Sequence, residues 1–151
     1  MSNEHRVIIP DRGALGTIDV NDVRNFIWDR TLDDNPLEMD LMFSDKEITD
    51  AMRYCAMKYN EMPPFVNTVM PQNLPFGSTF LSGIAAGLYL SKLQQESRQD
   101  VEYTAGSLTV DIQKRRLEHL TNFVKIFKEE FETLAKGIKL TINIHGAFGS
   151  Y

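Results

Sequence analysis

The side chains that most often carry enzymatic chemistry are few in this chain and far apart in sequence. The 151 residues include one cysteine, Cys55, and three histidines, His5, His119 and His145. None of the histidines stands at metal-ligand spacing from another histidine or from the cysteine. No glycine-rich phosphate loop follows a strand, and no serine occupies a nucleophile elbow. The sequence therefore predicts a protein that is not an enzyme and that holds no cofactor and no metal.

The densest group of carboxylates lies in residues 29–50, which hold eight acidic side chains against Arg30 and Lys46. Four of them could be considered for a calcium loop: Asp33, Asp34, Glu38 and Asp40. Their spacing does not match the alternating ligands of an EF-hand, and the turn glycine is missing. A solvated acidic loop is the favoured interpretation.

Composition and charge exclude several classes of protein. Hydrophobic residues make up 42% of the chain and charged residues 25%, which is ordinary for a globular domain. The net charge of −5 argues against binding nucleic acid through its phosphates. The longest apolar run, within residues 77–95, is shorter than the roughly 20 residues that a transmembrane helix needs, so no membrane association is expected. A single cysteine excludes an internal disulfide, and Cys55 is expected to be buried.

Three segments before residue 100 have helical signals. Ser44 and Glu47 form a capping box at the start of an amphipathic helix that ends before Pro63-Pro64. Residues 77–95 are apolar nearly all round, which is typical of a central buried helix. Asp19 or Asn21 could cap a shorter helix, and Trp28 after it could serve either the core or an interface.

The last third of the chain begins with a long amphipathic helix. Its apolar residues are spaced alternately by three and four positions: Leu117, Leu120, Val124, Phe127, Phe131, Leu134 and Ile138. Asp111 is a candidate N-cap, and Gly137 stands where a left-handed C-terminal cap is expected. A helix over residues 111–136 would be about 39 Å long.

Alternating side chains then predict a β-strand over residues 138–145, followed by a tail over residues 146–151. The apolar positions proposed to bind a partner are Ile138, Leu140, Ile142 and Ile144 in the strand, with Phe148 and Tyr151 in the tail. The short segment 6–9 is the one candidate mate within the chain. A lone strand leaves its backbone groups unpaired, so pairing with a neighbouring subunit is preferred over pairing with the N-terminus.

These signals together predict a mainly α protein. The fold expected is a helical bundle with one long C-terminal helix, a single β-strand and an extended tail. The predicted parts are an N-terminal arm over residues 1–18, a helical bundle domain over residues 19–137, and a C-terminal strand and docking tail over residues 138–151.

The order of these segments resembles one family of virion proteins. The capping-box helix is followed by Tyr59-Asn60-Glu61-Met62-Pro63-Pro64, then by the apolar helix, by Asp100-Val101-Glu102-Tyr103-Thr104-Ala105-Gly106, by the long helix, and by Ala147-Phe148-Gly149. Over roughly residues 40–151 the chain is similar to the head-to-tail adaptor, or connector, proteins of the tailed-bacteriophage neck. In that family a helical bundle sits in a ring beneath the portal.

The resemblance implies a structural virion protein that joins the portal to the tail. Its expected partners are other copies of itself in a ring of about twelve, the portal protein and other neck or tail proteins. DNA would pass through the channel without specific binding, and acidic residues could line that channel. The chain would be made in the host cytoplasm and reside in the virion. The alternative is a cytosolic helical binding module, such as a chaperone or regulatory adaptor, without enzymatic activity.

Overall fold

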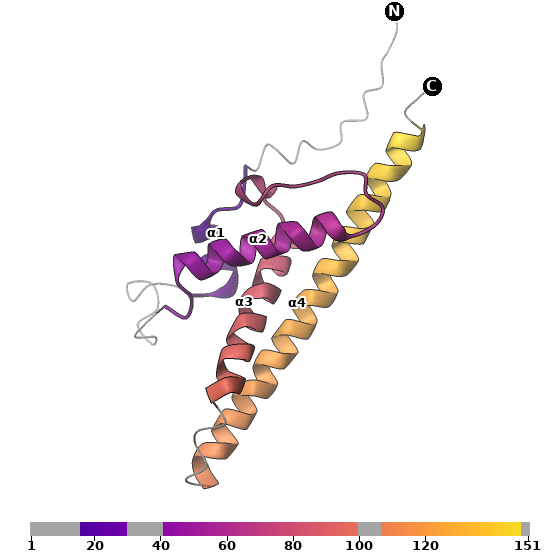
Figure 1. Cartoon of the computed structure of the whole chain (residues 1–151). Coiled ribbons are helices and arrows are strands. Elements are labelled where there is room, and N and C mark those ends of the chain that lie inside the picture. Colours follow the sequence, from indigo (N-terminus) through magenta and orange to yellow (C-terminus); the bar gives the residue numbers. More distant parts are fainter. Residues whose placement is uncertain (1–15, 30–40, 100–106, 149–151) are drawn as a thin grey trace, which may run out of the picture.

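The computed structural model describes residues 16–29, 41–99 and 107–148, which form a bundle of helices (Figure 1). Helix α1 spans Val20–Ile27 and helix α2 spans Asp45–Glu61. A single 3-10 turn, η2, covers Pro71–Asn73 before helix α3, Ser78–Gln99. Helix α4 runs from Ser107 to Phe148, and its 42 residues correspond to about 63 Å.

Helix α3 lies at the centre, packed on α4 along much of its length and crossed by α2 (Figure 1). The predicted burial of this helix is confirmed, because residues 79–86 are all buried. Gly83 explains how close the three helices come. A Cβ at this position would lie 2.5 Å from Sγ of Cys55 on α2 and 2.7 Å from Cδ2 of Phe131 on α4. The missing side chain therefore lets α2 and α4 meet over α3.

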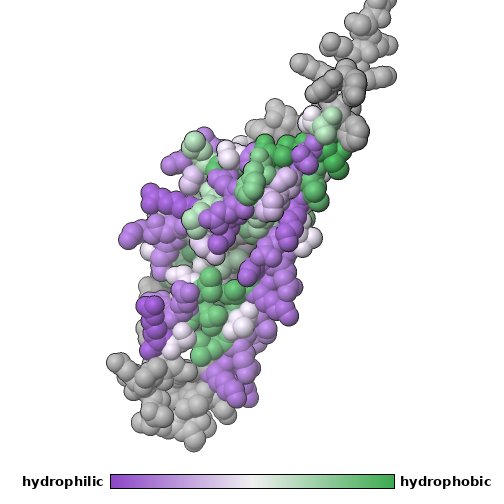
Figure 2. Space-filling model, turned by 45° about the vertical axis from the view of Figure 1, so that its right-hand side comes forward, coloured by the Kyte–Doolittle hydropathy of each residue, from purple (hydrophilic) through white to green (hydrophobic). Residues whose placement is uncertain are grey.

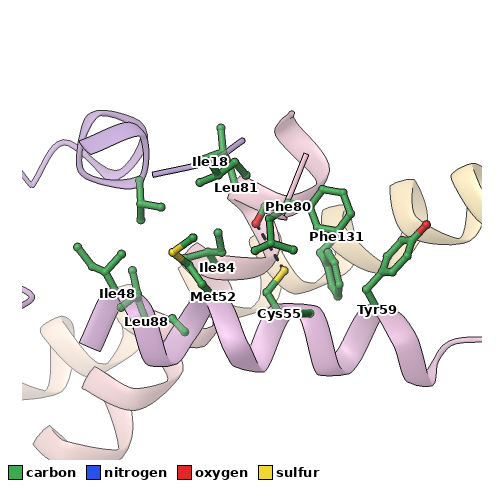
Figure 3. Close-up of a cluster of buried hydrophobic side chains, with 14 of the residues drawn as sticks. Ile18, Ile48, Met52, Cys55, Tyr59, Phe80, Leu81, Ile84, Leu88 and Phe131 are labelled. Carbon is green, nitrogen blue, oxygen red and sulfur yellow. Dashed lines mark hydrogen bonds between the residues drawn. The ribbon is translucent and has the colours of Figure 1, made fainter. Parts of the chain in front are cut away.

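The core forms where α2, α3 and α4 meet (Figure 3). Helix α2 begins at the predicted capping box, in which Ser44 accepts from the Glu47 amide and Glu47 accepts from the Ser44 amide. Its buried face consists of Ile48, Ala51, Met52, Cys55, Ala56 and Tyr59. Cys55 is buried as predicted, and its thiol donates to the carbonyl of Phe80 at 3.6 Å. Burial of the thiol raises its pKa to about 12.

An aromatic cluster that packs against the main core joins α1, α3 and α4. The ring of Tyr89 on α3 stacks on Phe127 of α4 with a centroid distance of 5.8 Å. Phe127 also contacts Phe26 of α1 at 5.8 Å, and Phe43 meets the edge of Tyr89 at 5.9 Å. Such pairs add about 0.5–1.5 kcal/mol each beyond the area they bury. This cluster holds α1 to the longer helices.

The segment before α1 is held by backbone hydrogen bonds to the loop before α3. The Ile18 amide donates to the Leu74 carbonyl at 2.9 Å, and the Phe76 amide donates to the Gly16 carbonyl at 3.2 Å. Ile18 and Leu74 are both buried. Helix α1 then starts at Asp19, which is the N-cap, so this candidate was correct and Asn21 was not.

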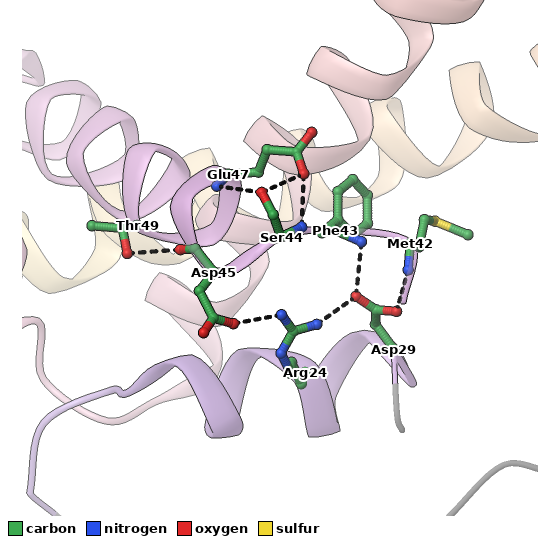
Figure 4. Close-up of polar contacts among 8 residues, drawn as sticks. All are labelled: Arg24, Asp29, Met42, Phe43, Ser44, Asp45, Glu47 and Thr49. Atoms are coloured by element: carbon green, nitrogen blue, oxygen red, sulfur yellow. Dashed lines mark hydrogen bonds and ion pairs between the residues drawn. The ribbon is translucent and has the colours of Figure 1, made fainter. Parts of the chain in front are cut away.

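A buried carboxylate ties the end of α1 to the start of α2 (Figure 4). Asp29 is 3% exposed and accepts from the amides of Met42 and Phe43, at 2.6 and 3.0 Å. Arg24 donates to Asp29 at 2.9 Å and to Asp45 at 2.6 Å. We call these three charged residues and the two amides the Asp29 clasp. One member of the predicted solvated acidic loop is therefore a structural group; Asp33, Asp34, Glu38 and Asp40 lie outside the described residues.

The predicted β-strand is wrong. Helix α4 continues without a break through residues 138–148, and the described part of the chain contains no strand longer than the isolated bridge between Thr17 and Pro75. Gly137 lies inside the helix and is not its cap. A helix satisfies its own backbone groups, whereas a strand needs a mate. Continuing α4 to Phe148 places two glycines, Gly137 and Gly146, inside the helix, at a cost in helix propensity of about 1 kcal/mol each.

The close approach at Gly83 predicts opposite effects for two glycine substitutions. Gly83→Ala places a methyl group against Cys55 and Phe131, and we expect it to lower the free energy of unfolding by about 1–3 kcal/mol. Gly137→Ala meets no atom within 4 Å and improves helix propensity, so it should raise that free energy by about 0.5–1 kcal/mol. Urea unfolding of both variants measures the difference. Equal effects of the two substitutions would contradict the packing described for α3.

The Asp29 clasp predicts a large loss of stability when its carboxylate is removed. Asp29→Ala leaves two amides and one nitrogen of the Arg24 guanidinium without their acceptor, and we expect a loss of about 3 kcal/mol in urea unfolding. Asp50→Ala is the matched control, because Asp50 is exposed and meets Arg53 at 3.7 Å. That control should change stability by less than about 0.5 kcal/mol. Similar losses for both would show that the clasp is not what holds α1 to α2.

Candidate interaction surface at the end of helix α4

The last turns of α4 extend past the rest of the bundle. Figure 1 shows the yellow end of α4 continuing beyond α2 toward the C-terminus. Ile138 packs against the core, and Lys139 donates a hydrogen bond to the Met62 carbonyl at 2.6 Å. From residue 140 to residue 147 every side chain is exposed. The bundle therefore supports α4 as far as Lys139, and the helix projects from there.

Lys139 anchors the projecting segment to the end of α2. Its side chain is fully buried, and its ammonium lies 4.6 Å from the centroid of the Tyr59 ring and 6.0 Å from that of Phe65. The Met62 carbonyl that it binds follows the last residue of α2, where the helix dipole favours a cation. Burial away from water lowers the pKa of Lys139 below its ordinary value of 10.5. A strand over residues 138–145 would put Lys139 on the face opposite Ile138 and Leu140, so this role was not predicted.

The residues predicted to bind a partner divide into two flanks of the helix. Residues two apart in an α-helix point about 200° apart, because each residue turns the chain by about 100°. Ile138 and Ile142 therefore share one flank, and Leu140 and Ile144 share the opposite one. We name these the Ile142 flank and the Leu140 flank. Phe148 is the last residue of α4, and Tyr151 lies outside the described residues.

Both flanks leave apolar side chains in solvent. Leu140 is 52% exposed, Ile144 54% and Ile142 37%. Figure 2 shows hydrophobic residues gathered at the upper end of the molecule, where α4 projects in Figure 1. Scattered apolar residues are common on protein surfaces, but three large exposed ones within five residues of a projecting helix end favour an interaction site.

The Ile142 flank also borders a hollow of about 690 Å³. Its described lining comes entirely from α4 and is mainly apolar: Thr133, Leu134, Gly137, Ile138, Thr141, Ile142, His145 and Gly146. No Asp, Glu, Lys or Arg is among these residues. The hollow can therefore accept an uncharged, apolar side chain.

Other parts of the described structure show no metal site and only smaller or more charged hollows. No group of three or more His, Cys, Asp or Glu side chains is placed to hold a metal ion within residues 16–29, 41–99 and 107–148. A hollow of about 330 Å³ between α2 and α3 is lined by Phe43, Tyr54 and Leu88 beside the carboxylates of Glu47 and Asp50. No helix among the described residues has both the length and the apolar content to cross a bilayer.

Comparison with known proteins finds no match for this chain among family models, curated proteins or solved structures.

The buried ammonium predicts a pH-dependent stability difference. Since the folded pKa of Lys139 lies below the unfolded value, the unfolded state binds more protons between the two, and the free energy of unfolding rises with pH in that window. Relative to Lys139→Met, the wild-type protein should therefore gain stability as the pH approaches 10.5. Urea unfolding of both proteins at several pH values tests this. Lys136→Met, at an exposed position on α4, controls for the loss of a positive charge. If the wild-type protein gained as much stability with pH relative to Lys136→Met as relative to Lys139→Met, burial of Lys139 would not be the cause.

Proposed function

We propose that this chain is a structural subunit of a larger assembly, and specifically a head-to-tail adaptor in the neck of a tailed bacteriophage. In this proposal identical copies form a ring that joins the portal to the tail. The observation that supports it best is the projecting end of α4, whose apolar side chains on two flanks are left in solvent in a single copy. A protein that worked alone would gain solubility by replacing Leu140 and Ile144 with polar residues.

Two further features favour an assembly subunit. The order of segments from the Ser44 capping box to Phe148 resembles that of the neck adaptors, and this resemblance implies a mainly α bundle, which is the fold class of the structure. The projecting segment is also firmly positioned, because Lys139 ties α4 to α2 immediately before the helix leaves the bundle. A rigidly held apolar end loses less conformational entropy on binding than a flexible one.

Only some acidic residues of segment 29–50 could face a DNA channel, because others are buried or paired. Asp29 is buried in the clasp, and Asp45 is paired with Arg24. Glu47 and Asp50 are exposed on α2 and are the described members that could repel DNA from a channel wall.

Truncation of α4 tests the proposed function. A chain ending at Lys139 keeps the Met62 anchor but lacks Leu140, Ile142 and Ile144. We expect it to fold, with an unfolding midpoint close to that of the full chain, and to be absent from assembled particles. The measurement is the mass of this protein per particle in phage made with either version. Normal incorporation of the truncated chain would contradict the proposal, and a full-length chain absent from particles would favour the binding-module alternative.

A further inference from the structure

The two flanks of the α4 end suggest what binds them. We propose that they bind each other between copies, so that the Leu140 flank of one copy packs on the Ile142 flank of the next. The contact would be head to tail, with each copy giving one flank to each of two neighbours. The proposal names the partner of the exposed end of α4, which is another copy of the same chain. It rests on the proposed function only in placing the assembly in a phage particle.

Two neighbours, each packed on one flank, account for the angle between the flanks. A helix packed on one partner typically buries a stripe a little more than 100° wide. Leu140 points about 200° away from Ile138 and Ile142, so one partner helix on the Ile142 flank leaves Leu140 and Ile144 in solvent. A two-fold dimer uses the same patch on both copies and would cover a single flank. A contact between unlike flanks, repeated around a ring, covers both.

The two flanks are also complementary in shape and chemistry. Leu140 and Ile144 are four residues apart and about half exposed, so they form a short i, i+4 ridge. Ridges of this kind insert into the grooves of a facing helix. The Ile142 flank offers the hollow described above, with Gly137 and Gly146 in its lining, and a Cβ at either glycine would meet no atom within 4 Å. An apolar ridge packed on the described lining of this hollow, which contains no charged residue, buries no unpaired charge there.

The small size of the surface favours a repeated contact over a single strong one. A standard interface buries about 800 Å² on each partner. Leu140, Ile142 and Ile144, each between 37% and 54% exposed, cannot supply that area by themselves. One contact between two copies should therefore be weak. Closure of a ring gives each copy two such contacts, which raises the stability of the assembly without enlarging either flank.

Mixing two variants tests the head-to-tail contact. The ridge variant is Leu140→Glu with Ile144→Glu, and the hollow variant is Thr141→Glu with Ile142→Glu. Ile138 is left unchanged because it packs against the core. Ile126→Glu is the matched control: Ile126 lies on the same helix and is 57% exposed, close to the 54% of Ile144. Circular dichroism verifies that every variant keeps the helical fold of the wild-type protein.

We expect the wild type and the control to self-associate in sedimentation experiments at protein concentrations up to about 1 mM. Each double variant alone should be monomeric. An equimolar mixture should form a dimer and stop there, because one intact ridge meets one intact hollow and no further contact is available.

Three results would overturn the inference: a wild type that stays monomeric over this range, a double variant that self-associates like the wild type, or folded variants that do not combine when mixed. A symmetric two-fold interface on one flank gives the second result, because the double variant that keeps that flank still pairs with itself. If the mixture forms the dimer but phage particles lack the protein, the contact stands and the proposed place in the phage neck is wrong.

Discussion

The arrangement of the helices depends on the space that Gly83 leaves on the central helix. With only a hydrogen atom at this position, Sγ of Cys55 and the ring of Phe131 come together over α3. Three helices can then share one dry core, in which Ile84 and Leu88 are almost fully buried. Because α4 is fixed through Phe131, every part of that helix beyond the core has a defined direction.

The length of α4 follows from the way helices satisfy their backbone. Each added residue makes its own hydrogen bond, so the helix can continue into solvent after the last contact at Lys139. Nothing in the bundle covers the side chains from Leu140 to Ile144, and they remain exposed. The apolar surface on which the proposed function depends is therefore exposed because α4 is longer than the core that it packs against. Its two opposed flanks are the basis of the proposal that two neighbouring copies bind it.

Two buried charges connect segments that are distant in sequence. Asp29 joins the end of α1 to the amides of Met42 and Phe43, and Lys139 joins α4 to the carbonyl of Met62. Each charge is stabilised by direct partners, which is the condition for burying an ionised group at tolerable cost. Both act as structural ties, and together they position the two ends of α2.

Local signals in the sequence determined much of the helical structure. The Ser44 capping box, the periodicity of α2 and the burial of Cys55 and α3 were all predicted, because each depends on neighbouring residues or on average hydrophobicity. The Asp29 clasp and the buried Lys139 were not predicted, since the backbone groups that these two side chains bind are 13 to 77 residues away. The stretch from Ile138 to Ile144 was assigned the wrong structure for a related reason. Alternating apolar residues fit a strand with one buried face and equally a helix with two apolar flanks. The choice between them depends on whether a mate strand is available, and the described residues contain none. The sequence by itself thus determined which residues must find apolar contacts, and the tertiary structure decided the geometry in which they are presented.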